Sequence, residues 1–316
     1  MLLHHAFGEV NGKKGVWGHA VGGMGAISDA IAEAAQSHGA DIETGAEISD
    51  VLIEHDRAAG VELKDGRVVR ARVIAANMTL KRLYTELVAK DTLSPAFSER
   101  MEHFKYGSGT FRMNVALSGL PNFKCLPGVD PGDHHGAGII IAPSLDYMDR
   151  AYRDARDRGW SSEPVIEMLI PSTIDPTLAP PGAHVASLFC QHVAPALPDG
   201  RSWDEARDEV ANLMIATVDR YAPGFAKSVI AHQILSPLDL DRTFGLTGGD
   251  IFHGQLSLNQ LFSARPALGY AAYRGPIKGL YHCGSGAHPG GGVTGAPGHN
   301  AAHAILRDLK PFSFFS

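Results

Sequence analysis

The chain has few cysteines and no long apolar run, and both shortages narrow the kind of protein it encodes. Its 316 residues include only three cysteines, Cys125, Cys190 and Cys283, with no Cys-x-x-Cys pair. This odd, widely spaced set argues against a disulfide framework, a dithiol centre or a cysteine zinc site, and favours a reducing compartment. The longest apolar run, at 138–142, is far shorter than the roughly 20 residues that cross a bilayer. We therefore expect a soluble, cytoplasmic protein, or a mitochondrial one in a eukaryote, and leave peripheral membrane contact open.

The sequence also has few features of a nucleic-acid-binding surface, a metal site or a catalytic nucleophile. The net charge is −6 with neutral histidines and no basic block is present, which argues against a nucleic-acid surface. Among sixteen histidines, His299 and His303 share one helical spacing but lack the glutamate of a zinc protease motif. We expect no metal site. No Gly-x-Ser-x-Gly motif supports nucleophilic catalysis.

The first part of the chain predicts a helix followed by short strands. Apolar residues at i, i+3 and i+4 spacing favour a helix over residues 26–38, with Gly39 at its C-terminal end. Asp65-Gly66 is a typical hairpin turn. The strands expected around that turn are at 42–44, 48–53, 60–63, 67–69 and 73–76. A helix, a meander and a buried strand are together typical of an α/β fold.

The middle of the chain predicts an antiparallel sheet. Residues 110–117 alternate between apolar and polar side chains, as a half-buried strand does. Further strands are expected at 165–170 and 185–190. A charged, exposed helix is expected over 146–158, and Ser202-Trp203-Asp204-Glu205 is a capping box that opens a helix to about Tyr221. The chain then returns to α/β chemistry, with expected elements at 279–283 (strand), 284–298 (glycine-rich loop) and 300–309 (helix).

Two glycine-rich loops could cradle a phosphate, because glycines allow close approach of backbone amides. Residues 23–28 nearly match Gly-x-Gly-x-x-Gly, and Glu43 stands where a ribose-binding acid would, so NAD binding and a tight turn both stay open. Residues 290–295 match the motif in full, but too near the last residue for a complete βαβ unit. They form either a secondary anion site or a loop that needs unusual backbone angles.

His288 is the histidine that we single out, because it lies inside the second loop next to Pro289. A histidine there could tune or protonate a bound cofactor or substrate. A hydrogen bond that fastens the loop is the alternative interpretation.

Several segments together resemble a known family. Gly22-Gly23-Met24-Gly25, the Asp65-Gly66 turn and the run from Gly279 to Val293 resemble phytoene dehydrogenase-like FAD-dependent oxidoreductases. Segments 175–182, 222–225 and 244–254 look like a closer subgroup, the pyridine nucleotide-disulfide oxidoreductase domain-containing protein 2 type. The resemblance extends from about residue 2 to residue 310.

The resemblance implies an α/β fold with an α+β substrate part: an incomplete glutathione-reductase-type FAD-binding Rossmann domain beside an antiparallel-sheet substrate domain. By position, it implies a partial FAD-binding domain over 1–80, the substrate domain over 81–270 and a return segment of the first over 271–316. It also implies cofactor contacts. Ile48 matches a residue near the adenine, Gly284 and Ser285 match residues near the pyrophosphate and ribityl chain, and the remaining three, which match the loop beside the flavin, are Gly291, Gly292 and Val293.

The sequence departs from the family at its start, where the N-terminal strand, its Gly-x-Gly-x-x-Gly and the following acid are absent. We therefore expect the C-terminal part of an FAD-dependent dehydrogenase or desaturase that acts on a small apolar substrate. An N-terminal half or a homo-oligomer would complete it. The alternative is a non-catalytic binding or interaction module derived from the same family.

Overall fold

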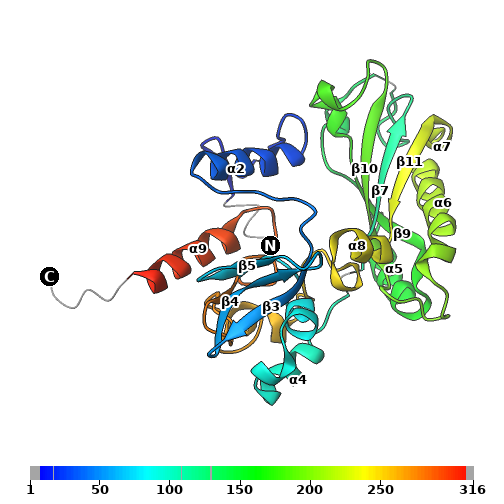
Figure 1. Cartoon of the computed structure of the whole chain (residues 1–316). Coiled ribbons are helices and arrows are strands. Elements are labelled where there is room, and N and C mark those ends of the chain that lie inside the picture. Colours follow the sequence, from blue (N-terminus) through cyan, green and yellow to red (C-terminus); the bar gives the residue numbers. More distant parts are fainter. Residues whose placement is uncertain (1–7, 17, 108, 129, 311–316) are drawn as a thin grey trace.

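The computed structural model describes residues 8–310 except 17, 108 and 129. Figure 1 shows two regions side by side. The first surrounds a five-stranded sheet, and the second contains a three-stranded meander, a parallel strand pair and the C-terminal helix. The mixed α/β fold with an antiparallel sheet is as predicted.

The five-stranded sheet is antiparallel throughout, in the order β11-β7-β10-β9-β8. Its strands are β7 (Phe111–Leu117), β8 (Ile139–Ile141), β9 (Trp160–Leu169), β10 (His184–Val193) and β11 (Val229–Leu235). The strand expected at 110–117 is confirmed, and its four apolar side chains are fully buried. Sequence patterns missed β8 and β11.

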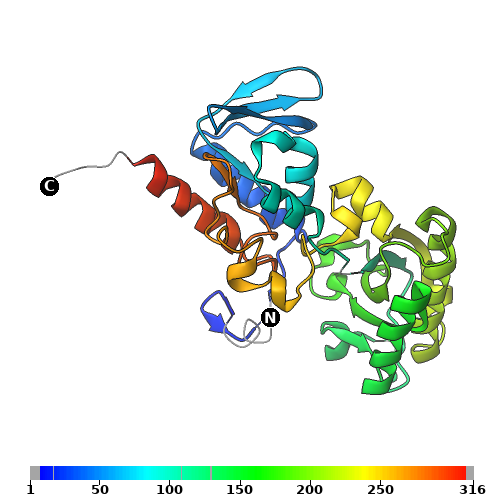
Figure 2. The ribbon, with the colours of Figure 1, turned by 90° about the horizontal axis from the view of Figure 1, so that it is seen from below.

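Helices pack on both faces of this sheet. The longest is α6 (Trp203–Tyr221), which begins at the expected capping box, since Ser202 and Glu205 exchange hydrogen bonds with each other's backbone. Figures 1 and 2 show α6 on the side of the sheet away from the second region. The other helices near the sheet are α5 (Leu145–Arg158), α7 (Phe225–Ser228) and α8 (Pro237–Phe244). Helix α5 was expected to be exposed. One side of it is instead buried, through Tyr147, Ala151 and Ala155.

The second region is assembled from both ends of the chain. Helix α2 (Gly25–Ser37) leads into the meander β3 (Ile48–Glu54), β4 (Arg57–Leu63) and β5 (Val68–Arg70). Strand β6 (Ile74–Ala76) pairs in parallel with β12 (Leu280–His282), some 200 residues later in the sequence. The remaining elements are β1 (Glu9–Val10), β2 (Lys13–Lys14), α3 (Leu80–Arg82), a π-helical turn (Leu83–Leu87), α4 (Pro95–Glu102) and α9 (Ala296–Leu309).

Two expectations for this region need correction. Residues 42–44 form no strand, because Ile42 is exposed and pairs with no neighbouring strand in the described structure. Helix α9 begins at Ala296, four residues earlier than expected, because Pro297 fits the first turn of a helix. Short 3₁₀ helices lie at Lys90–Thr92, Asp133–His135, Pro171–Thr173, Pro176–Leu178, Thr247–Gly249, Leu258–Gln260 and Phe262–Ala264.

The two regions differ in how well their helices are covered. Seven side chains of α6 are buried, whereas α2 has none. Val21, Met24 and Ile31, on or just before α2, are each at least 65% exposed. Across the part of the chain that the structure describes, no helix combines the length and the apolar character that crossing a bilayer requires.

Candidate functional site

The candidate site lies where the parallel strands β6 and β12 end. Their carboxyl ends meet at one edge, so Asn77, after β6, faces Gly284, after β12. A Cβ atom at Gly284 would overlap Asn77 Oδ1 and lie 3.1 Å from Asn77 Cα. Only glycine allows this approach. In open α/β sheets, ligands bind outside the carboxyl ends of parallel strands.

The loop after Gly284 folds back on itself. A Cβ atom at Gly291 would lie 3.2 Å from Ser285 Oγ and 3.9 Å from the Phe252 ring, so these three residues are neighbours. Helix α9 follows directly, with Gly295 at its N-cap. Its free N–H groups favour a bound anion. The structure thus brings Gly284, Ser285 and Gly291 together at the start of a helix.

Gly292 and Val293 form the exposed outer part of the same loop. Val293 is 70% exposed and has a φ of +57°. This left-handed conformation costs a β-branched residue about 1–2 kcal/mol. Such strain is often found at ligand-binding loops.

A buried arginine fastens the loop. Arg265 is fully buried, and its guanidinium donates to Ser285 O at 2.7 and 3.2 Å and to Phe252 O at 2.5 Å. It also donates to Gly254 O and Gln260 O, both at 3.4 Å. Burial lowers the pKa of Arg265, and the nearby Asp250 opposes that shift. One side chain therefore joins the glycine-rich loop to the segment that precedes it.

His253 has a buried ring atom near this loop. Its carbonyl oxygen lies 3.5 Å from the Cβ position of Gly286. Within the described structure its Nδ1 is buried without a hydrogen-bond partner. Burial lowers the pKa of His253, partly offset by Asp250 and by a hydrogen bond with the Met78 backbone. A buried polar atom of this kind usually marks a place for water or a ligand.

His282, on β12, is a second buried histidine. Its Nε2 lies 2.5 Å from the Tyr84 hydroxyl, and its Nδ1 has no partner among the residues described. Complete burial lowers the pKa of His282 to about 4. The ring is therefore neutral at pH 7 and supports the strand that leads to Gly284.

The other predicted residues lie in different surroundings. His288 is half-buried, and its ring centroid is 6.2 Å from that of Phe262. Ile48 begins β3, opposite Leu63, in a different sheet from β12. Roles for Ile48 and His288 stay predictions.

The first glycine-rich loop does not have the features of a nucleotide fingerprint. Residues 16 and 18, before it, lie in no strand. Glu43 forms an ion pair with Arg67 at 2.6 Å and is not free to bind a ribose. Gly22 N donates to Asp175 Oδ2 at 2.7 Å, so this turn docks on another loop. The structure favours the tight-turn interpretation over NAD binding.

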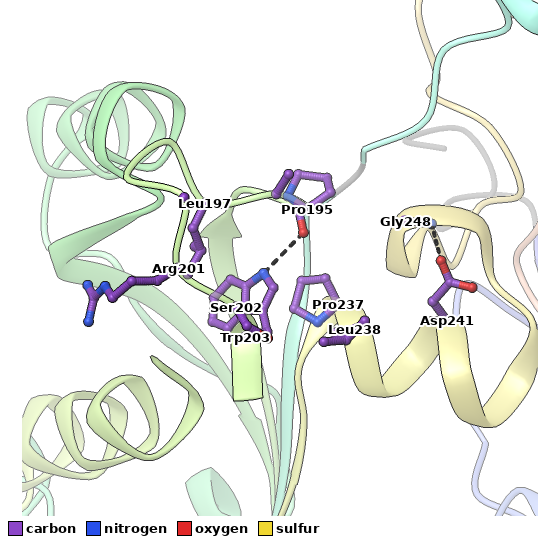
Figure 3. A pocket seen from close by; sticks show the side chains of 11 residues that line it. Pro195, Leu197, Arg201, Ser202, Trp203, Pro237, Leu238, Asp241 and Gly248 are labelled. Carbon is purple, nitrogen blue, oxygen red and sulfur yellow. Dashed lines mark hydrogen bonds between the residues drawn. The ribbon is translucent and has the colours of Figure 1, made fainter. Parts of the chain in front are cut away.

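Two cavities lie elsewhere. One, of about 330 Å³, is lined by side chains such as Pro195, Trp203 and Leu238 at the foot of the large sheet (Figure 3). The other, of about 510 Å³, lies at the turn of the meander near Arg57. Neither contains any of the seven predicted site residues. The rings of His299 and His303 lie 4.5 Å apart, but the described residues contain no cluster of three or more metal-ligating side chains.

The residues at the ends of β6 and β12 fit part of a dinucleotide. Close backbone approach at Gly284, a helix start after Gly295 and the unpartnered His253 Nδ1 are each suited to a polar, anionic ligand. Sequence reasoning noted the segment 244–254 only as a resemblance, and missed Asn77, His253 and Arg265. The buried arginine could not be recognised locally, since its partners are backbone carbonyls from distant positions.

Comparison with known proteins finds relatives that are described as oxidoreductases and desaturases. No family model matches the chain. Mouse and rat proteins described as pyridine nucleotide-disulfide oxidoreductase domain-containing protein 2 are 45% and 44% identical to it, over 98% of this chain and 54% of theirs. A lycopene-forming phytoene desaturase from Pseudescherichia vulneris is 24% identical, over 94% of this chain and 57% of its own. The chain thus spans about half the length of these relatives.

Solved structures share the fold. An oxidoreductase from Methanosarcina mazei matches with a TM-score of 0.58 at 18% identity, over 91% of this chain and 55% of that one. Putrescine oxidase matches with a TM-score of 0.57 at 16% identity, over 91% and 54%. The resemblance to phytoene dehydrogenase-like oxidoreductases is confirmed, with the domain-containing protein 2 subgroup as close homologues.

Proposed function

We propose that this chain, a homologue of the pyridine nucleotide-disulfide oxidoreductase domain-containing protein 2 subgroup, is the C-terminal part of an FAD-dependent oxidoreductase. The observation that carries the proposal is the meeting of Asn77 and Gly284 at the carboxyl ends of two parallel strands, followed by a glycine-rich loop and a helix start. This is where an α/β sheet binds a dinucleotide.

The proposed cofactor contacts follow the loop. Backbone groups of Gly284 and Ser285 would meet the pyrophosphate and ribityl chain, and those of Gly291, Gly292 and Val293 would lie beside the flavin. Ile48 would lie near the adenine. A bound flavin supplies hydride or electron transfer with a C–H or C=C bond of the substrate, while the protein orients the partners. His288 would hold or move a proton next to the ring.

A further segment would complete the cofactor site. The chain spans 54% of its mouse relative, and within the residues described no Gly-x-Gly-x-x-Gly directly follows a strand and opens a βαβ unit. Two uncovered surfaces support the idea. Helix α2 has no buried residue, and β6, between Asn77 and the meander, pairs only with β12 in the described structure. A dinucleotide-binding half, in the same chain or a second one, would cover both.

Flavin uptake tests the proposal. The chain would be produced alone and together with an N-terminal half that corresponds to the remaining part of the mouse relative. Each preparation would be mixed with FAD and desalted. We expect absorbance near ~450 nm only for the completed protein. Gly284→Ala should weaken FAD binding about tenfold or more, because the added Cβ overlaps Asn77.

Gly119→Ala is the matched control, since a Cβ there meets nothing within 4 Å. It should leave FAD binding unchanged. A folded, completed protein that stays colourless would contradict the proposal and favour the non-catalytic module. Equal FAD affinity in the Gly284→Ala and wild-type proteins would contradict the placement at this loop.

A further inference from the structure

The large sheet has a second face, of which α5 covers only a part through the small buried cluster of Tyr147, Ala151 and Val165. Along β7, Phe111, Met113 and Val115 are fully buried, while the alternate residues Arg112 and Asn114 are not. The strand pairings place five side chains of this open face in one row across the sheet. In order from β11 to β8 they are Leu235, Arg112, Phe189, Glu167 and Ile140.

Arg112 is the cation of this row and lacks a counter-ion. Its Nη2 donates to Ser187 Oγ at 2.9 Å, and its guanidinium lies over the Phe189 ring at 5.4 Å. Both partners are neutral. No carboxylate of the described residues forms an ion pair with Arg112, although ten other arginines have such a partner. Half-buried charges are normally paired, because losing water costs free energy.

Burial acts on Arg112 in the expected direction. It lowers the pKa of the guanidinium, and the nearest opposing influences are Cys190 and Glu167. Glu167 stands two strands away, roughly 10 Å across the sheet, and its carboxylate accepts from Gln191 at 3.2 Å. Glu167 therefore does not neutralise Arg112 by direct contact.

Apolar side chains continue this face beyond the cation. Phe189 lies beside Arg112, and Ile140 and Leu169 lie further across at 65% and 42% exposed. Ile140 shares the row of Arg112, and Leu169 occupies the next row on the same face, opposite Ser187. Glu167 lies between Phe189 and Ile140 in the row of Arg112, so the apolar side chains nearest the cation are Phe189 and, in the next row, Leu169. A cation beside apolar side chains suits an amphipathic molecule with one anionic end.

The cation lies at the end of the sheet nearest the glycine-rich loop. Gly107, five residues before Arg112, donates its N–H to Asp250, and Asp250 accepts from the N–H of Phe252, which neighbours Gly291. At about 3.3 Å per residue, Arg112 is within roughly 17 Å of Gly107. Figures 1 and 2 show α6 on the far side of the sheet, so the open face turns toward the second region.

We propose that the substrate is an amphipathic carboxylic acid, whose carboxylate pairs with Arg112 and whose apolar body lies over Phe189 toward Leu169 and Ile140. That this acid is a substrate rests on the proposed function, whereas its binding at Arg112 does not. An arginine fork fits both carboxylate and phosphate. We assign a carboxylate, since one arginine with Glu167 nearby balances a single negative charge better than two.

Calorimetric titration with twelve-carbon probes tests the assignment on the whole chain. The probes are dodecanoate, dodecyl phosphate, dodecanol and dodecylamine, each below its micellar concentration. We expect dodecanoate to bind at least about tenfold more tightly than each of the others. Arg112→Met should remove the preference over dodecanol, and Arg112→Lys should restore part of it, since lysine keeps the charge without the fork.

Arg158→Met, at the exposed end of α5, is the control and should keep the preference. Equal binding of dodecanoate and dodecanol by the wild type would overturn the inference, and so would a preference that survives in Arg112→Met. If dodecyl phosphate or dodecylamine bound more tightly than dodecanoate, the assignment of a carboxylate would be wrong. FAD uptake by the Arg112→Met and wild-type proteins, each completed with the upstream half, is measured in parallel. A wild-type protein completed with the upstream half that takes up no FAD, while the dodecanoate preference is intact, would defeat the proposed function alone.

Discussion

The large sheet and the glycine-rich loop are held in place by opposite means. The sheet packs against α6 through apolar side chains such as Met113, Leu188 and Met214, all fully buried. The loop, with few side chains of its own, is joined through Ser285 O to Arg265, which also donates to backbone carbonyls of the segment 252–260. Glycine contributes no apolar area, so side-chain packing cannot hold a glycine-rich loop. A buried donor with several N–H groups can, and the cost is a charge removed from water.

Removing the arginine should give the largest effect. Arg265→Leu leaves the carbonyls of Phe252, Gly254, Gln260 and Ser285 without this donor. At about 1–3 kcal/mol for each buried acceptor, we expect the free energy of unfolding to fall by about 5 kcal/mol. Urea denaturation measures it, with Arg158→Leu as an exposed control. A loss below about 1 kcal/mol would show that packing holds the loop after all.

The apolar side of the comparison is tested on two helices. Met214→Ala, on α6, should lower the free energy of unfolding by about 3 kcal/mol, because the side chain is fully buried. Ile31→Ala, on α2, should change it by less than about 0.5 kcal/mol, because Ile31 is 65% exposed. If the upstream half covers α2, the cost of Ile31→Ala rises in the completed protein. An unchanged cost there would leave the face of α2 without that partner.

Acid should weaken the second region through His282. Its pKa is lowered from 6.5 to about 4 in the folded chain, so below pH 6.5 the unfolded chain takes up a proton that the folded chain does not. Stability is full above pH 6.5 and declines as the pH falls toward 4, by about 3 kcal/mol. Comparing His282→Gln with wild type at several pH values isolates this contribution. Parallel pH profiles for the two proteins would contradict it.

The smallest expected effect concerns a helix end. Ser202→Ala removes the side chain that caps α6 and should cost about 1 kcal/mol. Ser37→Ala, at the exposed C-terminal end of α2, should cost less than about 0.5 kcal/mol. Thermal denaturation of both variants measures the difference. Equal midpoints would mean that the capping box contributes nothing beyond helix propensity.

Local sequence patterns predicted helices and strands well where the buried side chains recur at the spacing of the apolar residues in the sequence. β7 alternates in sequence and in burial, and α6 begins at its capping box. β11 was missed because its bulge and its exposed residues at 230–233 break the alternation. The strand expected at 42–44 was wrong because a short apolar run becomes a strand only when another strand pairs with it.

The sequence by itself determined the start of α6, the alternation of β7 and a glycine-rich loop ahead of the last helix. Tertiary structure alone decided that Arg265 holds that loop, and that Arg112, Phe189, Glu167 and Ile140 share one row. The physical reason is distance along the chain. Caps and periodicity depend on residues a few positions apart, whereas strand register and the partners of a buried arginine depend on how the whole chain packs.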